Sequence, residues 1–599
     1  MSRVSMRRTR ASVVALAAGA LVLSACSSGG GGGGAESGVD QADAKKQQLQ
    51  FAMGDDAASK GPATPVKGSR QGGSITMYQR DTPAHLDPAQ IYVSDQGAIS
   101  TLMTRRLTSY KKDASGKYTV VGDLATNSGK SSDGGKTWTY KLKDGVKWED
   151  GSPITSTDLR HTFERQFADF IGEGPIYVQQ WLADTSGTKY RQLLKGGPYG
   201  GKHLPSSLLE TPDKKTIKFH FKSAHPDLPY ALGMAGYGIV QKSKDTKQKY
   251  DQKPSSSGPY KVAYFKPGKG MKFVRNKEWD AKTDPVRHQF VDAYNVQFGV
   301  SYESTTKRLM SDSGQNKTAA TFTNQVDASS IQAVLSDKKV KERTVGSYQP
   351  YVARIVFNMS RLKDKKVREA ITAALPPKAL VQAMGGSSGG EIASNYVSPT
   401  VAGHTESDPY GMKKHPQGDV PKAKKLLKEA GKTGMKLTFA HRNSPEWQKF
   451  SAAASDNLRK AGFNVQSKDL VTDTYYDQIS KVKNTYDMYD ASWGADWPSA
   501  STVVPPTLDG RQIQDGSSNY AHYNNPKMNK EMDRISKITN KEESAKEWAK
   551  LADKIQREDL PEAPLMYYKQ LQLHGSKIGG VTVNDVLSAI DPTQLYVKK

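Results

Sequence analysis

The sequence predicts an α/β fold, in which strand-like and helical segments follow one another along the chain. Residues 137–142 alternate polar and apolar side chains after a Gly-Gly turn, which is typical of a strand. Thr155 and Asp158 have capping-box spacing, and an apolar helical face follows at Leu159, Phe163 and Phe167. Mean hydropathy is −0.67. The length of 599 residues predicts roughly two to four domains.

The N-terminus predicts a lipoprotein signal peptide. Arginines precede an apolar stretch from Ala11 to Leu23, which is too short to span a membrane but suits a signal peptide. The stretch ends in Leu23-Ser-Ala-Cys26, which resembles a bacterial lipoprotein box. We therefore expect residues 1–25 to be removed and Cys26 to be lipidated, by either the general or the twin-arginine export route. Since Cys26 is the only cysteine, an intrachain disulfide and a thiolate metal cluster are excluded.

Residues 26–67 predict a flexible tether between this anchor and the folded body. A run of glycines follows Cys26, and the stretch up to about Gly68 is polar and poor in apolar residues. Such a composition buries too little apolar surface to offset the entropy of ordering.

The charge pattern argues against a nucleic-acid partner. The net charge is +25, but lysine predominates and is mixed with acidic residues along the chain. Nucleic-acid binding favours clustered arginine with interleaved aromatic residues on one element. A basic surface on an exported lipoprotein is better suited to anionic membrane and wall polymers.

Several short sequence blocks follow one another along the chain: Leu86–Pro88, Ser132–Gly151, Ile154–Leu159, Ser257–Lys261, Val356–Asn358, Lys366–Ala370 and Pro421–Gly431. Each block is of low specificity alone, whereas the ordered set covers nearly the whole chain after the tether. Together these blocks resemble the extracellular solute-binding proteins of the oligopeptide/dipeptide ABC-importer family. Their spacing is most similar to that of actinobacterial members.

This resemblance implies a two-lobed, periplasmic-binding-protein-like α/β fold of class II, of the large cluster C type. Lobe I would comprise residues 68–299 and 564–599, and lobe II residues 300–563. Two hinge strands would join them, near Val291–Val300 and Leu565–Leu573, since both segments are strand-like and rich in apolar residues.

The resemblance also implies a ligand-binding segment at Trp493-Gly-Ala-Asp496. Asp496 would receive the ammonium group of a peptide, because a buried charge without a partner is costly. Trp493, Gly494 and Ala495 would pair with the peptide backbone, with Gly494 allowing close approach. Trp497 suits core packing as well as it suits a binding pocket.

Further candidates come from lobe I and from a departure upstream of Trp493. Tyr92 and Ser94 would lie on a strand that faces the ligand, and Tyr177 is a third candidate; each also suits ordinary packing. In tripeptide-preferring members an arginine three residues before the tryptophan receives the ligand carboxylate. Asp490 stands there in this sequence, so we expect the ligand to differ in length or in its terminus.

The sequence thus predicts a binding lipoprotein that captures oligopeptides by hinge closure and passes them to the membrane subunits of an ABC permease. We expect a monomer on the outer face of the cytoplasmic membrane, with no catalytic residue, metal or cofactor. An oligosaccharide-binding protein of the same fold is the alternative, with tryptophans as sugar platforms. A surface hydrolase is the remote alternative, because carboxylate pairs cannot be excluded by counting.

Overall fold

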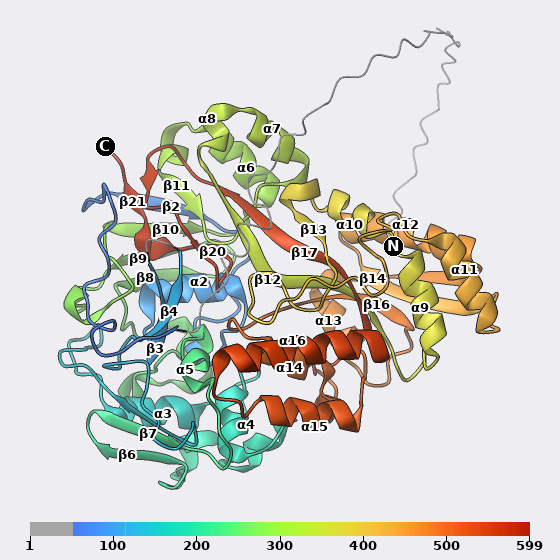
Figure 1. The fold of residues 1–599 in the computed structure, drawn as a ribbon. Helices are drawn as coiled ribbons and strands as arrows, with labels where there is room; N and C mark the ends of the chain where they lie inside the picture. The colour runs from blue at the N-terminus through green and yellow to red at the C-terminus, as the bar shows by residue number, and fades with distance from the viewer. Residues whose placement is uncertain (1–51, 114–115) are drawn as a thin grey trace, which may run out of the picture. The chain divides into compact units, whose positions relative to one another are not determined.

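Two large β-sheets organise the part of the chain that the computed structural model describes, residues 52–113 and 116–599 (Figure 1). Each sheet is the centre of one lobe. The five-stranded sheet has the order β11 (Ala319–Thr321), β2 (Ser74–Tyr78), β10 (Ala293–Gln297), β9 (Gly270–Arg275), β8 (Tyr260–Lys266). The six-stranded sheet has the order β13 (Gly390–Ile392), β17 (Glu562–Leu573), β12 (Thr344–Phe357), β16 (Met488–Gly494), β14 (Lys436–Arg442), β15 (Asn464–Leu470).

The first lobe, residues 52–343 and 574–599, is built on the five-stranded sheet. Its apolar side packs against α2 (Ser94–Met103), which buries Ala98, Ile99 and Leu102 among strand residues. The other helices of this lobe are α3 (Ser156–Arg165), α4 (Tyr177–Ala183), α5 (Leu228–Ala231), α6 (Tyr302–Ser311), α7 (Ile331–Ser336) and α8 (Lys338–Lys341).

Four small sheets complete the first lobe. A separate apolar cluster lies between β5, β7 and α3. The predicted strand at 137–142 is confirmed as β5, and the predicted capping box of α3 is present at Thr155 and Asp158. The small sheets are β1 (Ala52–Met53), β4 (Tyr118–Gly122), β3 (Thr108–Lys112); β5 (Thr137–Lys141), β7 (Thr216–His220), β6 (Leu209–Asp213); β18 (Ile578–Gly579), β21 (Tyr596–Val597); and β19 (Val583–Asn584), β20 (Ala589–Ile590).

The second lobe, residues 344–573, covers both faces of the six-stranded sheet with helices. Alternate residues of β12 point to opposite faces: Ile355 and Phe357 join one core cluster and Val356 joins the other. One face carries α9 (Lys365–Ala374), α10 (Pro377–Ala383), α11 (Val420–Glu429) and α12 (Pro445–Ala461). The other carries α13 (Tyr475–Ile479), α14 (Val504–Leu508), α15 (Pro526–Ile535) and α16 (Lys541–Glu558).

The strands that join the lobes are β12 and β17, which pair antiparallel from Thr344↔Leu573 to Val356↔Glu562. The predicted crossing at Leu565–Leu573 lies in β17. The predicted crossing at Val291–Val300 is wrong, because that segment is β10, an internal strand of the first lobe's sheet. The chain then returns to the same sheet through β11, so residues 300–343 stay in the first lobe.

The predicted tether ends earlier than residue 67. Residues 52 and 53 form β1, which pairs with β4, and Ser59 is fully buried with its hydroxyl accepting the backbone N–H of Gly122. Few apolar side chains are involved; backbone pairing and hydrogen bonds hold this segment. Cys26 and the predicted signal peptide lie outside the described residues. Within 52–113 and 116–599, no helix has the length and apolar character needed to cross a membrane.

Candidate ligand-binding site

A cavity of about 490 Å³ lies between the two lobes. Tyr92 forms part of its wall and has 39% of its surface exposed, so this ring is accessible to a ligand. A smaller neighbouring cavity, bordered by Asp496, shares Tyr92 with it. The aromatic residues of the larger cavity come from both lobes: Tyr92, Tyr177, Trp181, Tyr190, His225, Trp493, Trp497 and Trp548.

Asp496 follows β16 and presents its carboxylate to the first lobe. The hydroxyl groups of Tyr92 (2.9 Å) and Tyr177 both donate to the same carboxylate oxygen, Oδ2. Its backbone N–H donates to Thr502 Oγ1 at 3.1 Å, which fixes the segment. Burial raises the pKa of Asp496 to about 6, although the two tyrosine hydroxyls lower it.

No cation contributes to this pKa shift, so Asp496 has hydroxyl partners but no charged partner among the described residues. A partly buried carboxylate in this state favours a cationic ligand group beside it. The structure therefore places Asp496 beside Tyr92 and Tyr177, from which it is separated by 404 and 319 residues in sequence.

The strand edge at Trp493 is open on one side. β16 pairs with β12 along its length, including Val352↔Trp493, while on the other edge β14 pairs only with Met488 and Tyr489. Among the described strands, none pairs with residues 490–494 on that edge. At the start of this edge Tyr475 OH donates to the carbonyl oxygen of Asp490 at 2.8 Å, and farther along Trp493 borders the larger cavity. An edge without a strand partner beside a cavity suits backbone pairing with an extended peptide. Ala495 is buried beside this edge.

Gly494 has a different neighbour from the one expected. A Cβ atom at this position would lie 2.6 Å from the ring of Tyr351, which fills the space in front of the glycine. Glycine is therefore needed at position 494 because the ring of Tyr351, on β12, packs directly against its backbone. Tyr351 in turn approaches Ser94, with their hydroxyl oxygens 3.4 Å apart.

Residues 91–94 do not form the expected strand. Pro88–Gln90 is a single 3₁₀ turn, residues 91–93 are extended without strand pairing, and Ser94 begins α2. Because the chain turns into a helix here, Tyr92 and Val93 are exposed to the space between the lobes.

Trp497 comes from the second lobe but packs into the core cluster of the first lobe. Only 2% of its surface is exposed, and its ring meets Tyr177 edge-on with centroids 4.7 Å apart. A ring buried on both faces cannot stack on a sugar. Of its two predicted roles, packing is the one that the structure shows.

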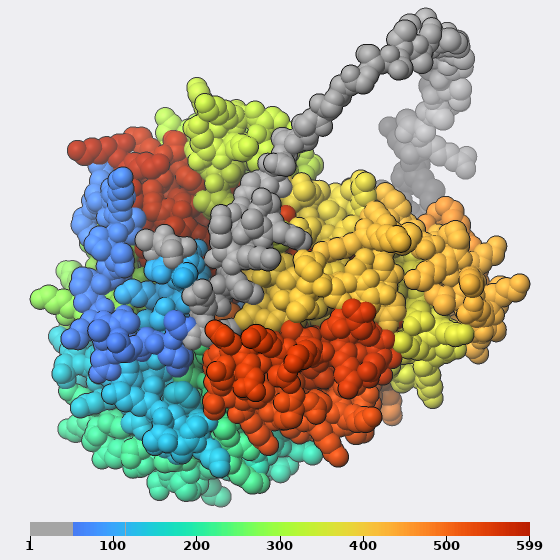
Figure 2. Space-filling model, viewed as in Figure 1, coloured from blue at the N-terminus to red at the C-terminus, as the bar shows by residue number. Residues whose placement is uncertain are grey.

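Asp227, which precedes α5 in the first lobe, accepts three donors from the second lobe. Trp497 Nε1 lies 3.2 Å and Ser501 Oγ 2.7 Å from Asp227 Oδ2, and Lys541 Nζ contacts Oδ1. Burial raises the pKa of Asp227, but the Lys541 ammonium and these donors outweigh it and hold the pKa below its usual value. Figures 1 and 2 show α16, in red, beside the cyan and green segments of the first lobe. We call these four residues the interlobe latch.

Asp490, the departure noted in the sequence, is fully buried and neutralised by Arg442 of β14. Its carboxylate accepts from Arg442 Nε at 2.7 Å and from Tyr475 OH at 2.9 Å. The Arg442 guanidinium also lies over the ring of Trp447, 4.9 Å from its centroid. The acidic residue therefore serves an ion pair inside the second lobe, and it does not border either cavity described above.

Replacing Asp490 by asparagine is expected to lower the free energy of unfolding by about 3 kcal/mol. This is the lower end of the range for a broken buried ion pair, because the Arg442 side chain is 17% exposed and water can solvate part of its charge. Urea unfolding measures the change. The matched control is Asp456→Asn, whose exposed pair with Lys460 is worth less than about 1 kcal/mol. Equal losses from the two variants would contradict this assignment.

Three features of the site have no signal in the sequence. Asp227, Lys541 and Tyr351 lie in ordinary loop, helix and strand contexts, and only folding brings them to the cleft. Among the described residues there is no group of three or more side chains that could hold a metal ion.

Comparison with known families gives one match that covers most of the chain. The family described as "Bacterial extracellular solute-binding proteins, family 5 Middle" matches residues 119–515. A probable D,D-dipeptide-binding periplasmic protein of Escherichia coli is 24% identical over 427 residues, 69% of this chain and 73% of that protein. The periplasmic oligopeptide-binding protein of Salmonella typhimurium is 24% identical over 489 residues, 78% of this chain and 82% of that protein.

Solved structures share the fold. The clavulanic acid biosynthesis oligopeptide binding protein 2 superposes with a TM-score of 0.81 at 25% identity, covering 93% of this chain and 100% of that one. An oligopeptide-binding protein of Bacillus subtilis, solved with a nonapeptide, has a TM-score of 0.67 at 19% identity, covering 89% of this chain and 100% of that one. The predicted two-lobed α/β fold is thereby confirmed.

Proposed function

The chain belongs to family 5 of the bacterial extracellular solute-binding proteins, and we propose that it captures oligopeptides between its two lobes and delivers them to an ABC importer. Members of this family bind a solute without converting it, so the chain is a binding protein and not an enzyme. The hinge closure that such a protein needs is supported by the two strands that join the lobes.

The observation that carries the peptide assignment is the carboxylate of Asp496. It lies between the lobes, it is partly buried, and its described partners are two tyrosine hydroxyls and no cation. The ammonium group of a peptide supplies the missing charge and can keep hydrogen bonds to the same oxygens. Trp493–Ala495 would then pair with the peptide backbone along the open edge of β16.

We extend the proposal to the location and partners of the protein. Lipidation of Cys26 would hold it on the outer face of the cytoplasmic membrane, with the tether giving the lobes freedom to reach the permease. One lipid chain binds a membrane only marginally, so a lipobox anchor needs more than one acyl chain or a basic surface as a second contact. Removal of residues 1–25 with their four arginines lowers the net charge from +25 to +21 (25 − 4), and this basic charge is suited to that second contact. The protein would act as a monomer.

Identification of the bound solute tests this function. The protein is purified without refolding, denatured, and the released small molecules are analysed by mass spectrometry. A mixed set of short peptides is expected, because side-chain pockets that hold water accept different shapes. Synthetic peptides are then titrated by calorimetry into protein freed of its solute. Release of glycans alone, together with no binding of peptides, would refute the proposal.

An oligosaccharide ligand is the second candidate, because four tryptophans line the large cavity. Trp497 and Trp548 are buried, which leaves Trp181 and Trp493 as half-buried rings for a sugar. A sugar has no ammonium, so its binding needs no carboxylate at 496. We expect Asp496→Ala to abolish peptide binding and Trp181→Ala to weaken it modestly. If a cello-oligosaccharide binds, and if Trp181→Ala abolishes its binding while Asp496→Ala leaves it unchanged, the ligand is a sugar.

A further inference from the structure

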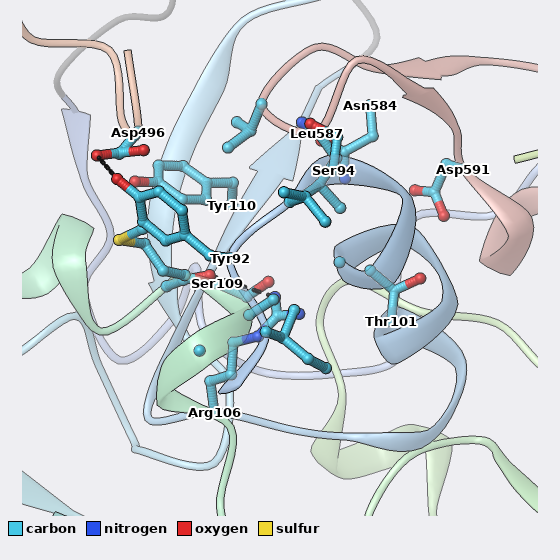
Figure 3. A pocket seen from close by; sticks show the side chains of 18 of the residues that line it. Tyr92, Ser94, Thr101, Arg106, Ser109, Tyr110, Asp496, Asn584, Leu587 and Asp591 are labelled. Atoms are coloured by element: carbon cyan, nitrogen blue, oxygen red, sulfur yellow. Dashed lines mark hydrogen bonds between the residues drawn. The ribbon is translucent and has the colours of Figure 1, made fainter. Parts of the chain in front are cut away.

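The small cavity beside Asp496 ends at an arginine that has no charged partner. The cavity measures about 70 Å³ and is bordered by Tyr92, by Asp496 and by one side of α2. Figure 3 shows Asp496 at one end of the drawn side chains and Arg106 at the other, with Tyr92 and Ser109 between them. The C-terminal segment of the chain closes the cavity with Asn584 and Asp591.

Arg106 is 5% exposed and uses one of its side-chain nitrogens. Nη1 donates to the carbonyl oxygen of Gly233 at 3.2 Å, while Nε and Nη2 have no hydrogen-bond partner among the described residues. Neither Asp496 nor Asp591 forms an ion pair with it, although both border the same cavity. The guanidinium at the wall of this cavity therefore keeps two nitrogens without a hydrogen-bond partner, and protein atoms cover both of them.

The neighbouring Arg105 and Arg287, unlike Arg106, both have carboxylate partners. Arg105 donates to Asp123 and to Thr283, and Arg287 donates to both Asp123 and Asp284. Those two guanidinium groups are compensated inside the core, whereas Asp123 meets Arg106 only through the backbone N–H of the arginine. The Arg106 side chain thus lacks the carboxylate contact that both neighbouring arginines have, although the charge of Asp123 still favours its protonated form.

Burial lowers the pKa of Arg106 to about 10, helped by the charge of Arg287, so the side chain stays protonated at neutral pH. An unpaired buried charge is costly unless another group satisfies it. Ser94, Thr101 and Ser109 add hydroxyl groups to the cavity wall. A volume of about 70 Å³ holds roughly five water molecules, enough for a carboxylate and a few waters.

We propose that this cavity is an anion subsite, in which Arg106 binds a carboxylate group through its Nε and Nη2 donors. The carboxylate is either the acidic side chain of a peptide whose ammonium lies at Asp496 or a free small carboxylate. The first form rests on the proposed peptide-binding function, and the second does not. In the first form Arg106 gives the protein a preference for acidic peptides, since Asp496 and Arg106 line one continuous cavity.

The test compares peptides that differ only in one charge. Tetraalanine carrying aspartate or asparagine at its first, second or third position is titrated by calorimetry into protein freed of its solute. We expect aspartate to bind at least about tenfold more tightly than asparagine at one of these positions, as a charged hydrogen-bonded pair provides. Arg106→Met abolishes that preference and leaves the asparagine peptide unchanged. Arg459→Met, an exposed arginine of α12, keeps it.

A second measurement needs no peptide. Thermal unfolding of the full chain is followed in sodium acetate and in sodium chloride at equal ionic strength. Acetate is expected to raise the melting temperature of the parent protein and of Arg459→Met, but not that of Arg106→Met. Arg106→Gln, which keeps an amide donor for Gly233, repeats both measurements with a smaller change in polarity.

The outcomes separate the two sources and the two proposals. An aspartate preference lost with Arg106 assigns the subsite to the peptide; an acetate effect alone assigns it to a free carboxylate. If peptides bind without preference and acetate has no effect, the anion subsite is overturned and the peptide function stands. If no peptide binds but acetate stabilises through Arg106, the subsite stands and the peptide function fails. Effects that persist in Arg106→Met overturn the subsite.

Discussion

Peptide affinity is expected to fall by roughly 30- to 4,000-fold when Asp496 is replaced by asparagine. The variant keeps the shape of the side chain and acceptance from Tyr92 and Tyr177, but it removes the charge that meets the ligand's ammonium. Truncating one partner of a buried charge pair costs about 2–5 kcal/mol, which corresponds to that range of affinities. Calorimetry with a peptide identified from the purified protein measures the change.

The matched control is Asp533→Asn, at the rim of the large cavity. Its side chain is 49% exposed and pairs with Arg511, so the same chemical change removes no buried charge. We expect its affinity to stay within about twofold of the parent protein. A loss in Asp533→Asn equal to that in Asp496→Asn would mean that general electrostatics, and not a contact at Asp496, attract the peptide.

The affinity of the parent protein is expected to depend on pH through the same carboxylate. In the free protein burial raises the pKa of Asp496 to about 6. A bound ammonium favours the ionised form and lowers this pKa, so binding releases a proton below pH 6. Affinity should therefore rise with pH up to about 6, and fall again as the peptide's amino group deprotonates near about pH 8. The affinity of Asp496→Asn should still decrease as the peptide's amino group deprotonates, but it should not increase as the pH rises to about 6.

The interlobe latch is the basis of the second large effect. Asp227→Ala removes the acceptor shared by Trp497, Ser501 and Lys541, and leaves the Lys541 ammonium without its counter-ion. We expect the equilibrium between closed and open lobes to shift toward the open form by about 2–5 kcal/mol. Small-angle scattering of the peptide-free variant should show a larger radius of gyration than that of the parent protein.

A double-mutant cycle isolates the charge pair within the latch. Lys541→Met alone should open the lobes less than Asp227→Ala does, since Trp497 and Ser501 keep their acceptor. The double variant should then add little to Asp227→Ala, because the ion pair is already lost. Fully additive effects would show that the two residues act separately, and unchanged scattering in all variants would show that the latch does not hold the lobes closed.

Local patterns in the sequence predicted the elements that depend on local chemistry. The capping box at Thr155 and Asp158 determines where α3 begins, and the alternating residues of β5 are confirmed as a strand. The prediction failed where a strand's partners decide its role. The segment around β10 resembles a crossing strand in composition, but β10 is paired on both edges within the first lobe's sheet, and composition cannot separate the two cases.

The candidate site divides in the same way. Asp496 was predicted from a motif of four residues, and the structure brings it to Tyr92 and Tyr177 as expected for a cleft residue. Gly494 was assigned to ligand approach, yet Tyr351, far away in sequence, occupies the space. Asp227 is assigned to the site by its contacts with Trp497, Ser501 and Lys541, and Arg106 by its two nitrogens without a partner. Only the tertiary structure determines these contacts.

The paired strands β12 and β17 are expected to restrict the two lobes to rotation about one axis. Their ladder is interrupted between Tyr348 and Val352, where Pro350 has no backbone N–H to donate. A second irregularity lies between Ala353 and Arg354. We therefore expect bending to concentrate over residues 348–354, whereas sliding is disfavoured because a one-residue slip would turn every side chain to the wrong face. We therefore expect the two lobes to rotate about this pair of strands. On the proposed function, we expect a permease that contacts both lobes to meet the same angle between them at each closure, whichever peptide is bound.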